Sequence, residues 1–195
     1  MTNESPRRGL NTAGAVDQTE HNKPTAPSAS FQSRLHWALS YARRGIHVFP
    51  LHSIHNGRCT CGRDCRRNAG KHPRVSGGFK VATTDARQIK AWWRKWPDAN
   101  IGIATGAISG ILVIDIDGRE GLDAWQILLA QNRASLRTVT VKTARGWHLY
   151  FKLPSGFVIP CSTGGGLDVR GEGGYVVAPP SIHASGHVYR WVGHA

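Results

Sequence analysis

Four side chains that bind soft metal ions lie close together in the first half of the 195-residue chain. Three thiolates and one imidazole suit a closed tetrahedral zinc site, in which no position is left open for a substrate. The surrounding Gly and polar residues offer few apolar side chains to hold this segment together otherwise. We therefore predict a structural zinc site in an insertion over about residues 56–74. Its ligands are Cys59, Cys61, Cys65 and His72.

Other interpretations of this cluster remain open. His52 or His55 could replace His72 as the fourth ligand, although His72 lies beyond the cysteines, where the chain can loop back. The cysteine spacing is not the usual pair of CxxC units. Reduced cysteines in a basic loop without a metal are a second possibility, since Cys161 stands alone and shows that not every cysteine here has a partner.

A carboxylate pair ends an apolar run in the second half of the chain. Asp115 and Asp117 close a predicted strand over 111–117, so both side chains point to one face, about 7 Å apart at the backbone. Hard oxygen ligands of this kind suit Mg²⁺ or Mn²⁺. Asp168, on a short strand flanked by glycines, is a candidate third carboxylate. A solvated pair before a turn is the alternative, and glycosyltransferases that use nucleotide sugars and Toprim nucleases share the same Asp-x-Asp pattern.

Two further residues could hold phosphates. Arg145 lies in a Gly-containing turn just before a strand that begins at His148. Turns of this kind, with an arginine, can bind phosphate oxygens.

The elements that must position these residues change character along the chain. Residues 1–30 are poor in large apolar side chains and are predicted to be a disordered tail. The rest, residues 31–195, is predicted to be one domain of α+β class, because helices come early and strands crowd later. The strands over 100–106 and 111–117 are expected to be adjacent. Helices are predicted over 31–44, about 83–96 and 121–131, and strands over 46–50, 100–106, 111–117, 137–143, 147–153, 167–170, 174–178 and 187–191.

The net charge is +13, from 25 Lys and Arg against 12 Asp and Glu. Residues 31–95 alone carry fourteen basic side chains and two acidic ones, Asp64 and Asp85. Such clustering favours a polyanionic partner such as nucleic acid. No apolar run approaches the roughly 18 residues of a membrane span, and no secretory signal is evident, so we expect a cytoplasmic protein with no membrane partner.

Taken in order along the chain, these motifs resemble the bifunctional DNA primase/polymerase (prim-pol) N-terminal domain of the archaeo-eukaryotic primase superfamily. The resemblance covers roughly residues 35–192. It rests on Ala38-Leu39-Ser40-Tyr41-Ala42 with Gly45 and Phe49-Pro50, the cysteine cluster with Gly70-Lys71-His72-Pro73, Trp92-Trp93, Asn100-Ile101-Gly102-Ile103 with Gly106, Val113-Ile114-Asp115-Ile116-Asp117, Gly146-Trp147-His148-Leu149-Tyr150-Phe151, and Leu167-Asp168-Val169-Arg170-Gly171 through Pro179-Pro180-Ser181-Ile182-His183.

The resemblance implies a role for each candidate residue. The domain would have a mixed or antiparallel sheet flanked by helices, with a zinc-binding insertion. The family often has a Ser-Gly-Gly-like turn before its histidine, where this chain has Ala144-Arg145-Gly146. By the resemblance, Asp115, Asp117 and Asp168 bind the catalytic Mg²⁺ or Mn²⁺, His148, Arg145 and Arg170 contact nucleotide phosphates, and Cys59, Cys61, Cys65 and His72 bind zinc.

The implied activity is that of a template-dependent DNA primase/polymerase, which transfers nucleotides from dNTPs or NTPs to a 3′-hydroxyl by a two-metal mechanism. The implied partners are a DNA template and primer, and a helicase or helical accessory domain on the same or a separate chain. The implied context is replication of a plasmid, phage or mobile element. The alternatives are a non-catalytic nucleic-acid-binding module or a fragment of a larger primase-helicase. A glycosyltransferase would leave the cysteines and the basic segment unexplained.

Overall fold

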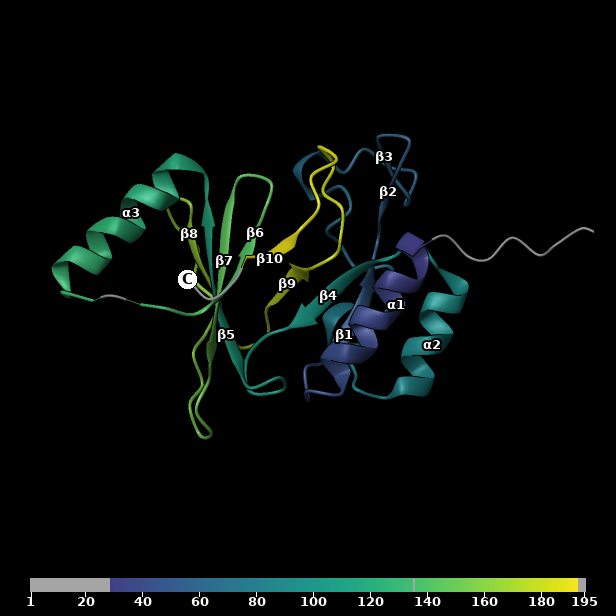
Figure 1. Cartoon of the computed structure of the whole chain (residues 1–195), viewed down its shortest axis with the longest axis horizontal. Helices are drawn as coiled ribbons and strands as arrows, with labels where there is room; N and C mark the ends of the chain where they lie inside the picture. The colour runs from purple at the N-terminus through teal and green to yellow at the C-terminus, as the bar shows by residue number, and fades with distance from the viewer. Residues whose placement is uncertain (1–28, 135, 193–195) are drawn as a thin grey trace, which may run out of the picture.

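The computed structural model describes residues 29–134 and 136–192 of the chain. It has the predicted α+β class, with helices and three sheets in which every pairing between named strands is antiparallel (Figure 1). The predicted N-terminal tail falls mainly on residues 1–28, which lie outside the described residues.

The first half of the chain builds a small sheet that is covered by two helices (Figure 1). Its strand order is β1-β4-β9, so β9 returns from the end of the chain to complete it. The central strand is buried along its whole length because its sequence is almost entirely apolar. The elements are α1 (Ala29–Ala42), β1 (Val48–Leu51), α2 (Ala86–Lys95), β4 (Asn100–Ala104) and β9 (Tyr175–Ala178).

The second helix begins slightly later than its sequence pattern predicts. Asp85 is the N-cap, and its carboxylate accepts a hydrogen bond of 2.8 Å from the backbone N–H of Arg87. Thr83 cannot join the helix because it exchanges two backbone hydrogen bonds with Val48. Within the described part, no helix has the length and hydrophobicity needed to span a membrane.

The second half of the chain builds a five-stranded sheet in the order β10-β6-β7-β5-β8. The helix α3 (Gly118–Gln131) lies against β5, β7 and β8, on the far side from α1 and α2 (Figure 1). The other face of this sheet is directed toward the first half of the molecule. The strands are β5 (Ile111–Asp117), β6 (Val139–Lys142), β7 (Gly146–Lys152), β8 (Leu167–Arg170) and β10 (Arg190–Val192).

The expectation that the strands near 100–106 and 111–117 are adjacent is wrong. They are β4 and β5, which belong to different sheets and are joined only through an isolated bridge between Gly106 and Ile111. The reason is that β4 already has a partner on each edge, β1 on one side and β9 on the other.

The cysteine-containing insertion consists of a short hairpin and a 3₁₀ turn. The strands β2 (Ile54–His55) and β3 (Arg58–Cys59) are joined by Asn56-Gly57. Both turn residues have positive φ, 48° and 74°, as a two-residue hairpin turn requires. The 3₁₀ helix η1 (Arg66–Asn68) follows, and η2 (Gly78–Val81) leads back toward α2.

Candidate functional site

A cavity of about 730 Å³ lies between the two halves of the molecule. Its walls come from the cysteine-containing insertion, from the exposed face of the five-stranded sheet, from β9 and from the segment near the C-terminal strand. All six residues predicted to bind catalytic metals or phosphates line this cavity. They are Asp115, Asp117, Arg145, His148, Asp168 and Arg170.

Three of these residues form a row across neighbouring strands. Asp115 on β5 lies directly opposite His148 on β7 and directly opposite Asp168 on β8. Residues that face each other across antiparallel strands project to the same side of the sheet. Asp117, two residues beyond Asp115, projects to that side too. The sheet register therefore gathers the carboxylates that the sequence separates by about fifty residues.

A single guanidinium lies between two of the carboxylates. One nitrogen of Arg170 is 2.7 Å from Asp168 Oδ2 and 3.6 Å from Asp115 Oδ2. Burial, against the opposing charge of Arg170 and with the added charges of Asp117 and Asp168, raises the pKa of Asp115 to about 6. The local balance is therefore unfavourable for an ionised Asp115, which is typical of carboxylates gathered for function.

The third carboxylate, Asp117, lies beside a tight turn. Asp117 pairs with Arg145, which lies in the turn between β6 and β7. Thr143 Oγ1 accepts a 2.9 Å hydrogen bond from the backbone N–H of Gly146 and holds this turn. A Cβ atom on Gly146 would lie 1.8 Å from the carbonyl oxygen of Ile116. Only glycine therefore fits where β7 begins beside the carboxylate strand.

His148 is a neutral donor or acceptor in this site. Burial, and then the charges of Arg170 and Lys71, lower its pKa to about 3. Its Nε2 is 3.5 Å from Asp115 Oδ1. Its Nδ1 is buried and has no hydrogen-bond partner among the described residues. Because the imidazole is uncharged at neutral pH, it offers one N–H without adding positive charge.

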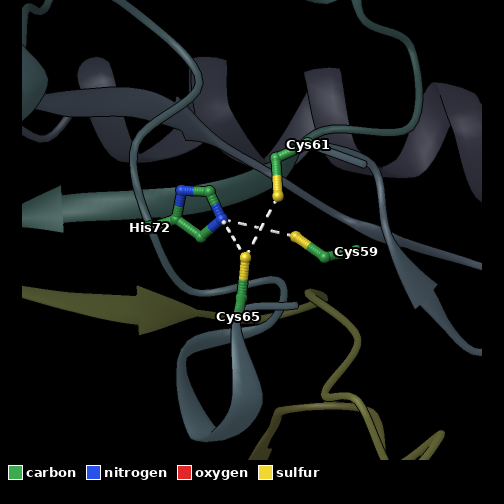
Figure 2. A group of neighbouring side chains, drawn as sticks. All are labelled: Cys59, Cys61, Cys65 and His72. Atoms are coloured by element: carbon green, nitrogen blue, oxygen red, sulfur yellow. Dashed lines mark hydrogen bonds between the residues drawn. The ribbon is translucent and has the colours of Figure 1, made fainter. Parts of the chain in front are cut away.

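The four predicted zinc ligands converge on one point (Figure 2). Their donor atoms all lie within 4.8 Å of one another. His72 Nε2 is 3.4 Å from Cys59 Sγ and 3.3 Å from Cys65 Sγ, and the sulfurs of Cys61 and Cys65 are 3.0 Å apart. Donors at the corners of a zinc tetrahedron are separated by about 3.5–3.8 Å. This Cys₃His cluster, called the knuckle below, could bind zinc.

Two sulfurs of the knuckle accept backbone hydrogen bonds, which favour the thiolate form that binds a cation. The backbone N–H of Gly70 donates to Cys59 Sγ and that of Arg63 donates to Cys61 Sγ, each at 3.4 Å. The hydrogen bond between Cys65 and Cys61 lowers the pKa of the Cys61 thiol and raises that of the Cys65 thiol. Of the alternative ligands, His52 lies against His72, with ring centroids 4.5 Å apart and ring planes tilted by 35°, and its Nδ1 hydrogen-bonds to the Thr60 hydroxyl, so it supports the ligand.

Several cavity-lining side chains were not among the residues predicted to bind catalytic metals or nucleotide phosphates. Lys71, Tyr175 and His183 are the clearest of these. The signal for Lys71 was its place directly before a metal ligand. His183 follows Pro179-Pro180-Ser181, where a sharp change of chain direction was to be expected.

Comparison with models of protein families shows to which family the chain belongs. The model of the bifunctional DNA primase/polymerase N-terminal family, Prim-Pol, matches residues 38–195. The chain belongs to the Prim-Pol family. The match includes the knuckle, both larger sheets and every residue that lines the cavity, so the resemblance noted in the sequence is confirmed. A comparison with curated proteins found no match.

Membership in Prim-Pol supports a general activity. The family is one of DNA primase/polymerase domains, so it supports a nucleotidyltransferase that acts on DNA and nucleotides. Glycosyl transfer, which the two aspartates alone would allow, is not the activity for which this family is named.

Proposed function

We propose that this Prim-Pol chain is a template-dependent DNA primase/polymerase that transfers nucleotides from dNTPs or NTPs to a 3′-hydroxyl. The observation that carries the proposal is the row formed by His148, Asp115 and Asp168, with Asp117 beside it, on the wall of one cavity. A cavity of about 730 Å³ falls in the range of small-molecule sites, about 300–1,000 Å³, and so is large enough for a nucleotide.

The carboxylates of Asp115, Asp117 and Asp168 would hold the catalytic Mg²⁺ or Mn²⁺. Their fit rests on hard oxygen donors and on the burial and neighbouring negative charges that raise the pKa of Asp115, because a cation stabilises the ionised carboxylates. When bound, such ions activate the attacking hydroxyl and stabilise the leaving pyrophosphate. The protein's part is to fix the carboxylates in register, which the pairing of β5 with β8 achieves.

The cationic and neutral donors in the cavity would bind the nucleotide's phosphates. Arg170 lies against Asp115 and Asp168, and Arg145 lies against Asp117. Each guanidinium can therefore turn one edge to a carboxylate and another to phosphate oxygens, since it carries five donors. His148 would donate its single N–H to a phosphate oxygen.

The knuckle would hold a structural zinc ion and present a basic surface to DNA. Arg58, Arg63 and Arg66 are exposed around it, and Arg67 reaches the rim of the cavity. A rigid cationic loop beside the site can bind phosphates of the template or primer. We place this insertion at about residues 56–74 within a catalytic domain of residues 31–195.

The proposal also extends to the biological setting of the activity. The proposal includes replication of a plasmid, phage or mobile element and cooperation with a helicase or helical accessory domain. Both rest on the family alone.

A primer-extension assay tests the proposed activity. The purified chain, a primer annealed to a longer template, dNTPs and Mg²⁺ or Mn²⁺ should give extended primers. Asp115→Asn should reduce extension at least 100-fold, because it removes a charged metal ligand. The matched control is Asp123→Asn, which changes an exposed aspartate on α3 outside the cavity.

Two results would count against the proposal. Extension that is unaffected by Asp115→Asn would place the chemistry elsewhere or in a contaminant. Salt-sensitive DNA binding without any metal-dependent extension would instead support a non-catalytic DNA-binding module.

A further inference from the structure

Lys71 lies where the knuckle meets the cavity. It directly precedes the ligand His72, and its side chain lines the cavity. Its ammonium group is within electrostatic reach of the carboxylates of Asp115 and Asp117. Among the described residues, however, it makes no ion pair within 4.0 Å and no side-chain hydrogen bond. A half-buried cation that has no protein partner is suited to an anionic ligand.

The backbone around Lys71 is fixed from both sides. Its N–H donates to the carbonyl of Asn68 at 3.1 Å, and its own carbonyl accepts from the Tyr175 hydroxyl at 3.2 Å. The residue before it, Gly70, donates its N–H to Cys59 Sγ, and the residue after it is His72. The conformation at Lys71 therefore follows directly from the arrangement of the knuckle ligands.

Asn100 ties this segment to the opposite wall of the cavity. Its side chain is fully buried. The amide nitrogen donates to the carbonyl of Gly70 at 2.9 Å and to that of Ile182 at 2.8 Å, and the amide oxygen accepts from the N–H of Ile182 at 3.0 Å. One buried amide thus holds together the neighbours of two cavity residues, Lys71 and His183.

His183 offers a second donor at the same end of the cavity. Its Nδ1 accepts a hydrogen bond from the backbone N–H of Ser185 at 3.1 Å. In the neutral imidazole the proton must then reside on Nε2. This end of the cavity therefore presents an ammonium group and an imidazole N–H, both of which bind phosphate oxygens.

We propose that Lys71 is a phosphate-binding residue of the nucleotide site and that the knuckle positions it, so that zinc at the knuckle and a nucleotide in the cavity bind cooperatively. This inference rests on the proposed polymerase function. The knuckle then has a task beyond its basic surface, because its metal holds a side chain that contacts the substrate. Thermodynamic reciprocity requires that the nucleotide also tighten zinc binding by the same factor.

Nucleotide binding without DNA tests the role of Lys71. The dissociation constant of dATP with Mg²⁺ would be measured by calorimetry on the full zinc-loaded chain, where no turnover can occur. Lys71→Met should raise that constant roughly tenfold or more, since it removes a hydrogen bond to a charged group. Lys71→Arg should restore part of the affinity. Lys90→Met, on the exposed side of α2, is the matched control and should leave the constant unchanged.

Zinc removal tests the coupling. After treatment with a zinc-selective chelator, the wild-type dissociation constant for dATP should rise several-fold, whereas that of Lys71→Met should barely change. If circular dichroism shows that the stripped chain unfolds, Asn100→Ala replaces zinc removal. That variant keeps all four ligands and should weaken dATP binding in the wild-type background but not in Lys71→Met.

The outcomes separate this inference from the proposed function. If the wild-type chain extends primers and Lys71→Met binds dATP as tightly as it does, the inference is overturned and the polymerase function stands. An equal rise on zinc removal in both proteins overturns the coupling. If the zinc-loaded wild type neither binds dATP nor extends primers, the proposed function itself fails.

Discussion

The buried carboxylate of Asp115 destabilises the fold that carries it. Its pKa of about 6 in the folded chain lies above the value of about 3.9 expected in the unfolded chain. The folded state therefore binds this proton more tightly than the unfolded state does. The cost is fully present above pH 6, shrinks as the pH falls from 6 to 4, and is absent below about pH 4.

Asp115→Asn should therefore stabilise the metal-free protein while it abolishes activity. At pH 7.5 we expect a gain of about 1–3 kcal/mol in the free energy of unfolding, because a neutral amide replaces a desolvated charge. At pH 4.5 most of the gain should be lost. Denaturant unfolding at the two pH values measures both quantities.

The exposed pair of Asp123 and Arg119 provides the comparison. Asp123→Asn should change stability by less than about 1 kcal/mol at either pH. A lower stability of Asp115→Asn at pH 7.5, or a gain that persists unchanged at pH 4.5, would show that burial does not raise this pKa.

For single residues, the sequence predicted which side chains take part in the site better than it predicted which of them are in contact. The alternation in 111–117 was enough to place Asp115 and Asp117 on one face. The pairing of Arg170 with Asp168 follows from two positions on one strand, which also share a face. Lys71 was predicted only as part of the basic surface around the cysteines and not as a residue of the nucleotide site, because no local pattern indicates that a loop of the first half folds back over the second.

The start of β7 is constrained by its neighbour β5. Gly146 lies so close to Ile116 that a methyl group has no space. Gly146→Ala should lower the free energy of unfolding by about 1–3 kcal/mol, as overpacking does, and should displace the strand end that carries Asp117. The melting temperature and the rate of primer extension should therefore both be lower in this variant.

Gly164→Ala serves as the matched substitution, since an added Cβ there meets nothing within 4 Å and its φ is not positive. It should leave stability and extension nearly unchanged. Equal effects of the two substitutions would show that the close approach at Gly146 is unimportant.

The knuckle should retain metal only with its full set of ligands. We expect about one zinc ion per wild-type chain, as for a four-ligand structural site. Cys61→Ser should lose most of that zinc during dialysis because one thiolate is replaced by a poor ligand. Elemental analysis by mass spectrometry measures the metal content.

Cys161→Ser controls for the loss of a thiol, because Cys161 is exposed and lies outside the cluster. It should retain the wild-type zinc content. Zinc that stays bound in Cys61→Ser, or no zinc in the wild type, would contradict the assignment of the knuckle.

Element boundaries could be predicted from the sequence more readily than element partners. The strands over 111–117 and 167–170 have the predicted bounds because each is a short apolar run with clear turn signals. The separation of β4 from β5 was missed, because pairing depends on which distant strands occupy each edge. β9, some seventy residues beyond β4, takes one of those edges.

Over the whole molecule most of the excess positive charge lies in residues 31–95, whereas the clustered carboxylates lie in the second half of the chain. The insertion supplies exposed arginines, whereas the five-stranded sheet supplies the aspartates. Arg58→Ala with Arg63→Ala should weaken binding to duplex DNA. It should also reduce the dependence of log affinity on log salt by about 0.9 for each phosphate contact that is lost. Fluorescence anisotropy over a salt series measures this slope.

The charge-matched comparison is Arg119→Ala with Arg137→Ala, two exposed arginines of the second half. These should leave the slope nearly unchanged. If both pairs reduce it equally, DNA binding is a property of net charge and the insertion has no special part in it.

Single-nucleotide addition on a defined template tests the central claim most directly. With Mg²⁺ or Mn²⁺ and one dNTP at a time, the account predicts that the wild-type chain adds only the nucleotide complementary to the templating base. Asp168→Asn should lose this addition and Asp123→Asn should keep it. Absence of addition by the wild type, addition without regard to the template, or full activity of Asp168→Asn would contradict template-directed transfer at this cavity.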